Sequence, residues 1–216
     1  MSEARRQIFD RLRTALAGVA DKAPLPDYAA DVARTLGAKT PGDPVGRFRE
    51  RLESVRGRAF AEPAALGAWL REQGATRGYC DPALAGWLGP ALGAGIALET
   101  ALDRARIDDY QFGVTRARAA IAETGSLILD DATTARRLGA LAPWIHVAVL
   151  PADRILPDVA AALATLGDDP NVIFCTGPSK TADVEGILIE GVHGPGEQVA
   201  LILPAGQPQG HHAQND

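Results

Sequence analysis

Apolar runs with the character of β-strands alternate with helical stretches between residues 75 and 203. The clearest strand-like runs are Ile145 to Leu150, Val172 to Cys175 and Val199 to Leu203, and a stretch that opens at Pro157 has helical spacing. Strands that alternate with helices over short connections are typical of βαβ units, in which helices cover a parallel sheet. The sequence therefore predicts an α/β fold whose sheet is buried on both faces.

Two shorter apolar runs near the middle of the chain predict a β-hairpin. Ala119 to Ala122 and Ser126 to Leu129 are joined through Glu123-Thr-Gly125. Gly125 can take the positive φ that a tight turn requires, because it has no Cβ atom. On turn chemistry alone, Glu123-Thr-Gly-Ser126 is a hairpin turn that carries one carboxylate.

The N-terminal part of the chain has helical periodicity. Apolar residues recur at helical spacing from Ile8 to Leu16 and again from Tyr28 to Leu36. We therefore expect a helical arm or cap over residues 1–60, an α/β domain over residues 61–204 and a disordered tail over residues 205–216, which is rich in Gly, Gln, Pro and His.

Charge and cysteine content narrow the classes of partner. The formal net charge is −5, which disfavours nucleic-acid binding because that requires a basic surface. Cys80 and Cys175 lie far apart and belong to no CxxC or Cys/His cluster, so we expect no metal or iron–sulfur cluster held by this chain alone. The N-terminus lacks the apolar segment of a signal peptide, and no run reaches the ~18–20 apolar residues of a membrane span. We expect a cytoplasmic protein of undetermined oligomeric state.

The segment that follows the strand-like run Val172 to Cys175 is the strongest candidate site. In Gly177-Pro-Ser-Lys-Thr181, a glycine permits close backbone approach, Ser179 and Thr181 offer hydroxyls, and Lys180 offers a cation. Pro178 completes this loop, and successive N–H groups in such a turn can hold an anion. Asp183 and Glu185 follow directly; they are either a cap and a surface carboxylate, or groups that orient Lys180, bind a ligand hydroxyl or act as acid or base.

Two histidines receive different interpretations. His193 lies in Gly191-Val-His-Gly-Pro195, a loop in which a side chain is exposed and available to a site, although a lone histidine is often structural. His146 lies inside the strand-like run Ile145 to Leu150, which favours a satisfied core or edge position over a catalytic role.

Three common enzyme motifs are missing from the sequence. Ser179 precedes Lys180 where a Walker A loop needs glycine, so nucleotide hydrolysis of that type is disfavoured. No GxGxxG follows a strand-like run, and no GxSxG elbow is present, which disfavours Rossmann-type dinucleotide binding and a Ser/His/Asp hydrolase.

Four motifs in a fixed order resemble the LUD domain family. They are Gly113-Val-Thr115, Ala120-Ile-Ala-Glu-Thr-Gly-Ser-Leu-Ile-Leu129, Gly177-Pro-Ser-Lys-Thr-Ala-Asp-Val-Glu185 and Gly191-Val-His-Gly-Pro195. The resemblance covers roughly the last half of the chain. Two positions differ from the usual family pattern: Ser126 stands where threonine is common, and Lys180 stands where arginine is common, which keeps the charge but loses bidentate geometry.

The resemblance implies a fold and a pathway. The fold would be a ribose-phosphate isomerase/CoA-transferase-like α/β sheet with helices on both faces. The pathway would be the oxidation of L-lactate to pyruvate, together with partner proteins that carry the iron–sulfur clusters. The resemblance also makes Thr124, Gly125 and Ser126 the second half of the site that contains Gly177–Thr181 and His193, with Glu123, Asp183 and Glu185 as candidate catalytic groups.

The resemblance leaves three functions open. The chain could be a component of a lactate-oxidising complex that binds a small anionic metabolite. It could be a stand-alone enzyme for a phosphorylated or CoA-linked metabolite, with Glu123 as acid, base or nucleophile. It could also be a non-catalytic assembly subunit whose motifs hold loops together.

Overall fold

The computed structural model describes residues 3–19, 42–134, 136–167, 171–182 and 187–206. Its contacts divide the chain into two units, Met1–Pro41 and Gly42–Asp216. In the first unit, helix α1 (Glu3–Leu16) confirms the helical spacing of its apolar residues, none of which is buried. The predicted stripe from Tyr28 to Leu36 lies outside the described residues.

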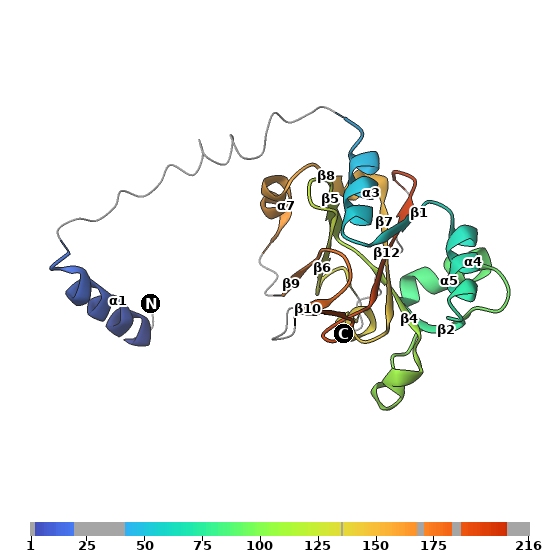
Figure 1. Ribbon diagram of the computed structural model, residues 1–216, viewed down its shortest axis with the longest axis horizontal. Helices are drawn as coiled ribbons and strands as arrows, with labels where there is room; N and C mark the ends of the chain where they lie inside the picture. The colour runs from blue at the N-terminus through green and yellow to red at the C-terminus, as the bar shows by residue number, and fades with distance from the viewer. Residues whose placement is uncertain (1–2, 20–41, 135, 168–170, 183–186, 207–216) are drawn as a thin grey trace. The chain divides into compact units, whose positions relative to one another are not determined.

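A six-stranded parallel sheet forms the centre of the second unit (Figure 1). The strands in spatial order are β1 (Arg58–Phe60), β12 (Glu197–Leu203), β7 (Ile145–Pro151), β4 (Phe112–Arg116), β2 (Arg77–Cys80) and β3 (Ala97–Glu99). All five neighbouring pairs are parallel. The predicted α/β fold is confirmed.

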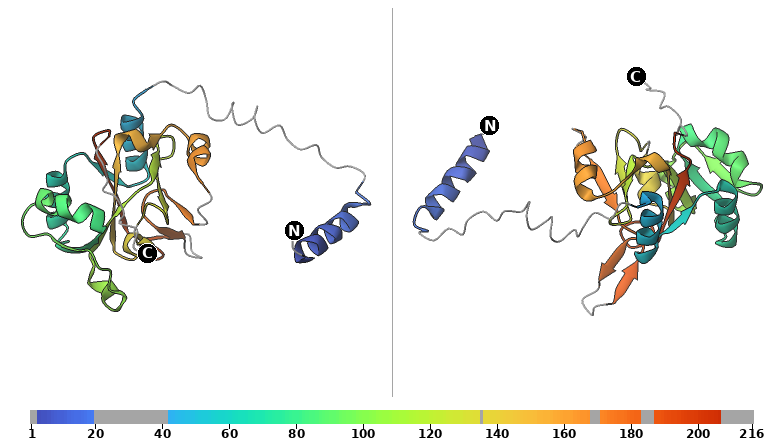
Figure 2. Two further views of the ribbon diagram at one scale, coloured as in Figure 1. Left: turned by 180° about the vertical axis from the view of Figure 1, so that it is seen from behind. Right: turned by 90° about the horizontal axis from the view of Figure 1, so that it is seen from above.

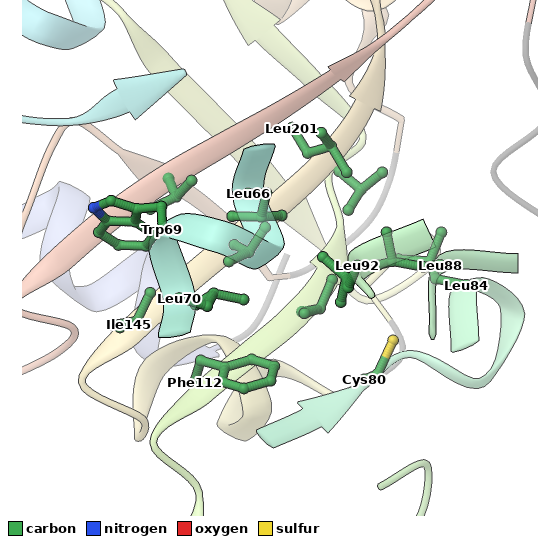
Figure 3. Packing of buried hydrophobic residues seen from close by; sticks show 14 of the residues in the cluster. Leu66, Trp69, Leu70, Cys80, Leu84, Leu88, Leu92, Phe112, Ile145 and Leu201 are labelled. Atoms are coloured by element: carbon green, nitrogen blue, oxygen red, sulfur yellow. The ribbon is translucent and has the colours of Figure 1, made fainter. Parts of the chain in front are cut away.

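Helices α4 (Pro63–Glu72) and α5 (Pro82–Leu92) cover one face of this sheet. Figure 3 shows Leu66 and Leu70 of α4 and the leucines of α5 gathered against Phe112, Ile145 and Leu201 of the sheet. The side chain of Asp81 accepts a hydrogen bond from the Ala83 N–H and so caps α5.

The opposite face carries helix α3, the short helix α6 and a second sheet. Alanines and leucines of the parallel sheet pack there against Phe48 and Leu52 of α3 (Pro44–Ser54) and Ala140 of α6 (Arg137–Leu141). The four-stranded sheet has the order β8 (Ile155–Leu156), β5 (Ala119–Ile121), β6 (Ser126–Asp130) and β9 (Val172–Cys175). The predicted hairpin is confirmed, since β5 and β6 pair antiparallel around Gly125.

Further helices and a pair of strands belong to the second unit. Helix α7 (Val159–Thr165) packs against the four-stranded sheet, and two short 3₁₀ helices, η1 (Arg104–Asp109) and η2 (Ala152–Arg154), connect strands. Strands β10 (Lys180–Ala182) and β11 (Leu188–Glu190) form a hairpin that extends away from the sheets (Figure 2).

The predicted boundaries at residues 60 and 204 stay predictions. The structure places α3 and β1 in the same unit as the sheet, where β1 is hydrogen-bonded to β12. Most of the predicted tail, residues 207–216, lies outside the described residues. No helix in the described ranges is both long and apolar enough to cross a membrane.

Buried polar groups lie between the central strands on the α3 side. His146 of β7 contacts the Thr115 hydroxyl of β4 through Nε2 at 2.9 Å and the Gln198 amide of β12 through Nδ1 at 3.0 Å. All three side chains are buried. This is the satisfied core histidine that the sequence predicts. Desolvation lowers the pKa of His146 from 6.5 to about 4, although the hydrogen bond to Gln198 opposes the shift.

Candidate functional site

The turn between β5 and β6 and the segment after β9 meet in the structure. Strands β6 and β9 pair antiparallel, which brings the start of one beside the end of the other. The Ser126 hydroxyl lies 2.6 Å from the Thr176 hydroxyl and 2.7 Å from that of Thr124. The predicted halves Thr124–Ser126 and Gly177–Thr181 are therefore adjacent, and Thr176 joins them although sequence reasoning did not select it.

Both glycine turns pack against the C-terminal half of α3. Gly125 has φ +69°, and a Cβ atom there would lie 2.4 Å from the backbone nitrogen of Leu52. Gly177 has φ +75°, and a Cβ atom there would lie 2.3 Å from the carbonyl oxygen of Val55. Glycine is therefore required at both positions for two reasons, the backbone conformation and the close approach of the helix.

Helix α3 ends in a Schellman motif with an arginine where glycine is usual. The Gly57 N–H donates to the Leu52 carbonyl at 2.8 Å, and the Arg56 N–H donates to the Glu53 carbonyl at 2.9 Å. Arg56 has φ +68°, which is uncommon for a residue with a side chain. Its guanidinium donates to the Glu190 carboxylate at 2.7 Å, so the helix end is tied to β11.

Ser179 joins the two glycine-rich motifs of the C-terminal region. Its N–H donates to the Pro195 carbonyl at 2.8 Å, and its carbonyl accepts from the Gly191 N–H at 2.9 Å. Its hydroxyl accepts from the His193 N–H at 3.3 Å. The Ser179 N–H is therefore bonded within the protein and does not face a ligand. That other N–H groups of this loop hold an anion stays a prediction. Lys180 and Thr181 also belong to strand β10 and not to a loop.

A pocket of about 570 Å³ opens beside these motifs. Pro178 lines it together with Glu53 of α3 and with Arg56 and Arg58, which follow that helix. Glu190 and Glu197 also line it. Both arginines are paired, Arg56 with Glu190 at 2.7 Å and Arg58 with Glu197 at 3.6 Å.

Lys180 supplies a further cation. It does not line this pocket, but it lies opposite Glu190, which does. Its ammonium donates to the Val55 carbonyl at 3.4 Å, and its side chain is exposed. A lysine ammonium has three donors, so this contact leaves donors for a ligand carboxylate or phosphate. We refer to Thr124–Ser126, Thr176–Lys180 and Gly191–Pro195 as the glycine-motif cluster.

Of the three candidate catalytic carboxylates, Glu123 is the one that lies within the described residues. The Glu123 carboxylate accepts a hydrogen bond from the Val159 N–H at 3.4 Å, so it lies at the start of α7. Asp183 and Glu185 lie outside the described residues. His193 is exposed, and its backbone is held by Ser179.

Neither cysteine has the character of a reactive thiol. Burial raises the pKa of Cys80 to about 12 and that of Cys175 to about 11. Both thiols are therefore protonated at neutral pH, which makes them weak nucleophiles. Among the residues that the structure describes, no three His, Cys, Asp or Glu side chains lie together as a metal site.

We expect Ser126→Ala to lower the free energy of unfolding by about 1 kcal/mol, because it removes the central hydroxyl of a three-member chain. Thr124 and Thr176 reach water and can replace the lost bond in part. Urea denaturation measures the change. The control is Ser54→Ala, which removes an exposed hydroxyl bound to the Arg51 carbonyl and is expected to cost less than about 0.5 kcal/mol. Equal losses in the two variants would contradict a special role for the hydroxyl chain.

Comparison with known proteins gives concordant matches. The family model described as LUD domain matches residues 91–203. A lactate utilization protein C from Deinococcus radiodurans is 29% identical over 94% of this chain and 96% of its own length. A lactate utilization protein C from Exiguobacterium is 41% identical over 99 residues, which are 42% of this chain and 43% of that relative.

A solved structure supports the fold. The crystal structure of a DUF162 family protein from Deinococcus radiodurans matches with a TM-score of 0.54 and 23% identity, over 77% of this chain and 98% of that chain. At this identity the likeness concerns the fold alone.

Proposed function

Since the chain belongs to the LUD domain family, we propose that it is a component of a lactate utilization system. The observation that carries the proposal is the match to a lactate utilization protein C over 94% of this chain and 96% of that relative. The match spans nearly the full length of both chains.

The reaction in this proposal is the oxidation of L-lactate to pyruvate. It releases two electrons, so a redox partner must accept them. The chain has two cysteines, of which Cys80 is buried and Cys175 half-buried, whereas an iron–sulfur cluster is usually held by four. We therefore assign the clusters to partner proteins and give this chain the role of binding the small anion and those partners.

The glycine-motif cluster is the proposed anion site. Lys180 provides the charge, and the pocket beside Pro178 provides the space. The lactate carboxylate would accept hydrogen bonds from the Lys180 ammonium. His193 lies in the motif that Ser179 holds next to this segment, and its exposed side chain could donate to the same anion.

Growth on L-lactate as the only carbon source tests the pathway. Deletion of the gene from its host should abolish this growth, and the intact gene should restore it. Normal growth of the deletion strain on lactate would exclude the proposed role.

Variants in the same assay test the site. Lys180→Ala should lower the lactate-dependent rate about tenfold, because it removes one charged hydrogen bond to the substrate. Arg154→Ala is the matched control, since it removes an exposed cation outside the glycine-motif cluster. Circular dichroism of both proteins must match the parent. If Lys180→Ala complements fully, the anion site is elsewhere.

Glu123→Gln separates a chemical from a structural role for that carboxylate. Glutamine keeps an oxygen that can accept from the Val159 N–H, so the variant should fold normally. Full complementation by the folded variant would show that Glu123 is not an acid, base or nucleophile in the reaction, whereas loss of growth would support catalysis by it.

A further inference from the structure

A second pocket, separate from the glycine-motif cluster, has a volume of about 600 Å³ and carries three arginines. It lies between the segment after β3, which contributes Leu102 and Arg104, and the segment that leads into α6. Its volume lies within the range of about 300–1,000 Å³ that small-molecule sites occupy.

The pocket lies at a favourable place in the sheet. From β2 the chain moves outward to β3, whereas β4, β7 and β12 follow one another in the opposite direction. The direction therefore reverses between β2 and β4, and open α/β sheets bind ligands at the carboxyl ends of strands next to such a reversal. Thr134, which lines the pocket, donates its hydroxyl to the carbonyl of Arg116, the last residue of β4, at 3.0 Å.

A buried ion pair fixes the same end of the sheet. The Arg116 guanidinium donates to the Asp81 carboxylate at 2.8 Å, and both side chains are at most 7% exposed. Asp81 follows β2 directly, so the pair joins the ends of β2 and β4. The ends of β2 and β4 beside the pocket are therefore held in place by this ion pair. A ligand there would bind to a surface that does not have to rearrange.

The charge of the pocket is only partly neutralised by the protein. Arg137 is paired with Asp131 at 2.7 Å, and Asp131 also accepts from Asn171 at 2.8 Å. Among the described residues, neither Arg104 nor Arg136 forms a salt bridge.

Neighbouring arginines outside the pocket are paired. Arg77 and Arg106 both contact the carboxylate of Glu99. The two uncompensated charges of Arg104 and Arg136 are thus concentrated in the pocket. A phosphate monoester carries a charge of about −1.5 to −2 at neutral pH, which matches two arginines, whereas a monocarboxylate matches one.

Apolar side chains line the rest of the pocket. Leu102, Leu138 and Leu141 contribute to its wall, and Leu138 is 37% exposed. Such a wall suits a ligand whose anionic group is attached to an apolar or aromatic part, because inorganic phosphate alone would leave it in contact with water.

We propose that this pocket binds an organic phosphate, with the phosphate between Arg104 and Arg136 and the apolar part against Leu102, Leu138 and Leu141. The site is distinct from the glycine-motif cluster and takes a ligand of higher charge than lactate. It gives the chain a second small-molecule specificity beyond the proposed role in lactate utilization.

Calorimetric titration of the full chain with phenyl phosphate tests the proposal. We expect one saturable site, and we expect benzoate, which has the same ring and one charge, to bind at least about tenfold more weakly. Arg104→Ala/Arg136→Ala should weaken phenyl phosphate binding by at least about tenfold. Arg154→Ala, which removes an exposed arginine of another pocket, should leave it unchanged.

Leu138→Ser tests the apolar wall. It should weaken phenyl phosphate several-fold and leave the binding of inorganic phosphate unchanged, since only the ring contacts leucine. Circular dichroism confirms that each variant is folded, and Arg104→Lys/Arg136→Lys gives a second pair that keeps the charge and should retain part of the affinity.

Three results would overturn the proposal. The first is the absence of saturable phenyl phosphate binding up to about 20 mM, beyond the weakest affinities of interest. The second is equal weakening by the double alanine variant and by Arg154→Ala. The third is inorganic phosphate binding as tightly as phenyl phosphate, with no effect of Leu138→Ser on either.

Discussion

Replacing Gly125 with alanine is expected to lower the free energy of unfolding by about 2–5 kcal/mol. Two costs add at this position. A residue with a side chain pays about 1–2 kcal/mol for the left-handed conformation at φ +69°. The new Cβ atom would also lie 2.4 Å from the Leu52 nitrogen and 2.6 Å from the Arg51 carbonyl carbon, and overpacking against backbone costs a further ~1–3 kcal/mol. Urea denaturation followed by circular dichroism measures the loss.

Gly74→Ala is the matched control for this prediction. Gly74 has φ +70°, almost the same as Gly125, but a Cβ atom there would meet nothing within 4 Å. In Gly74→Ala the free energy of unfolding should therefore fall by the conformational cost alone, about 1–2 kcal/mol. The difference between the variants measures how rigidly α3 is held against the β5–β6 turn. Equal losses would mean that the helix moves away without cost, and that the contact does not fix the glycine-motif cluster.

The strands with the longest apolar runs were predictable from the sequence. Ile145 to Leu150 and Val199 to Leu203 became β7 and β12, which lie side by side in the middle of the sheet. A central strand of a parallel sheet is buried on both faces, so nearly all its residues are apolar and the run is easy to recognise.

Other elements were missed for physical reasons. Strand β4 contains Gly113 and ends in Thr115 and Arg116, so it lacks a continuous apolar run. Gly113 is needed because a Cβ atom there would lie in direct conflict with the Gly139 carbonyl of α6. Strand β1 has three residues, too few for a periodic pattern.

Helix α5 was missed because Pro90 and glycines interrupt it. Its leucines at positions 84, 88 and 92 share one face, and they are buried in the core. Tertiary packing therefore outweighs low helix propensity here. The signal that could have revealed the helix is Asp81-Pro82, an N-cap followed by proline at the first helical position.

The candidate site was predictable as a set of motifs but not as an arrangement. The Ser126 and Thr176 hydroxyls meet because β6 pairs with β9, a register that no local pattern specifies. The Glu123 side chain points from the turn toward α7, where its carboxylate accepts a hydrogen bond from the Val159 N–H. Arginine pairing is equally non-local, so the sequence could not indicate that Arg104 and Arg136 share a pocket.

We expect His146 to make the protein lose stability in mild acid. Its pKa is 6.5 in the unfolded chain and about 4 in the folded protein, since burial disfavours the charged imidazolium. Between these values the unfolded state binds more protons, so the free energy of unfolding falls as the pH falls. The contribution is fully present above pH 6.5, and about 3 kcal/mol of it is lost by pH 4 at 1.36 kcal/mol per pKa unit. Urea denaturation at intervals across this range measures the loss.

Carboxylates also titrate near the lower end of this range, so the test depends on a pair of variants. His146→Gln removes the titrating group and keeps polar atoms that can bond Thr115 and Gln198. Its stability should depend less on pH, by about 3 kcal/mol between pH 6.5 and pH 4. His193→Gln removes an exposed histidine and should keep the parent pH dependence. If both variants follow the parent curve, His146 is protonated in the folded state at pH 5. The bonds among β4, β7 and β12 must then accommodate a charge.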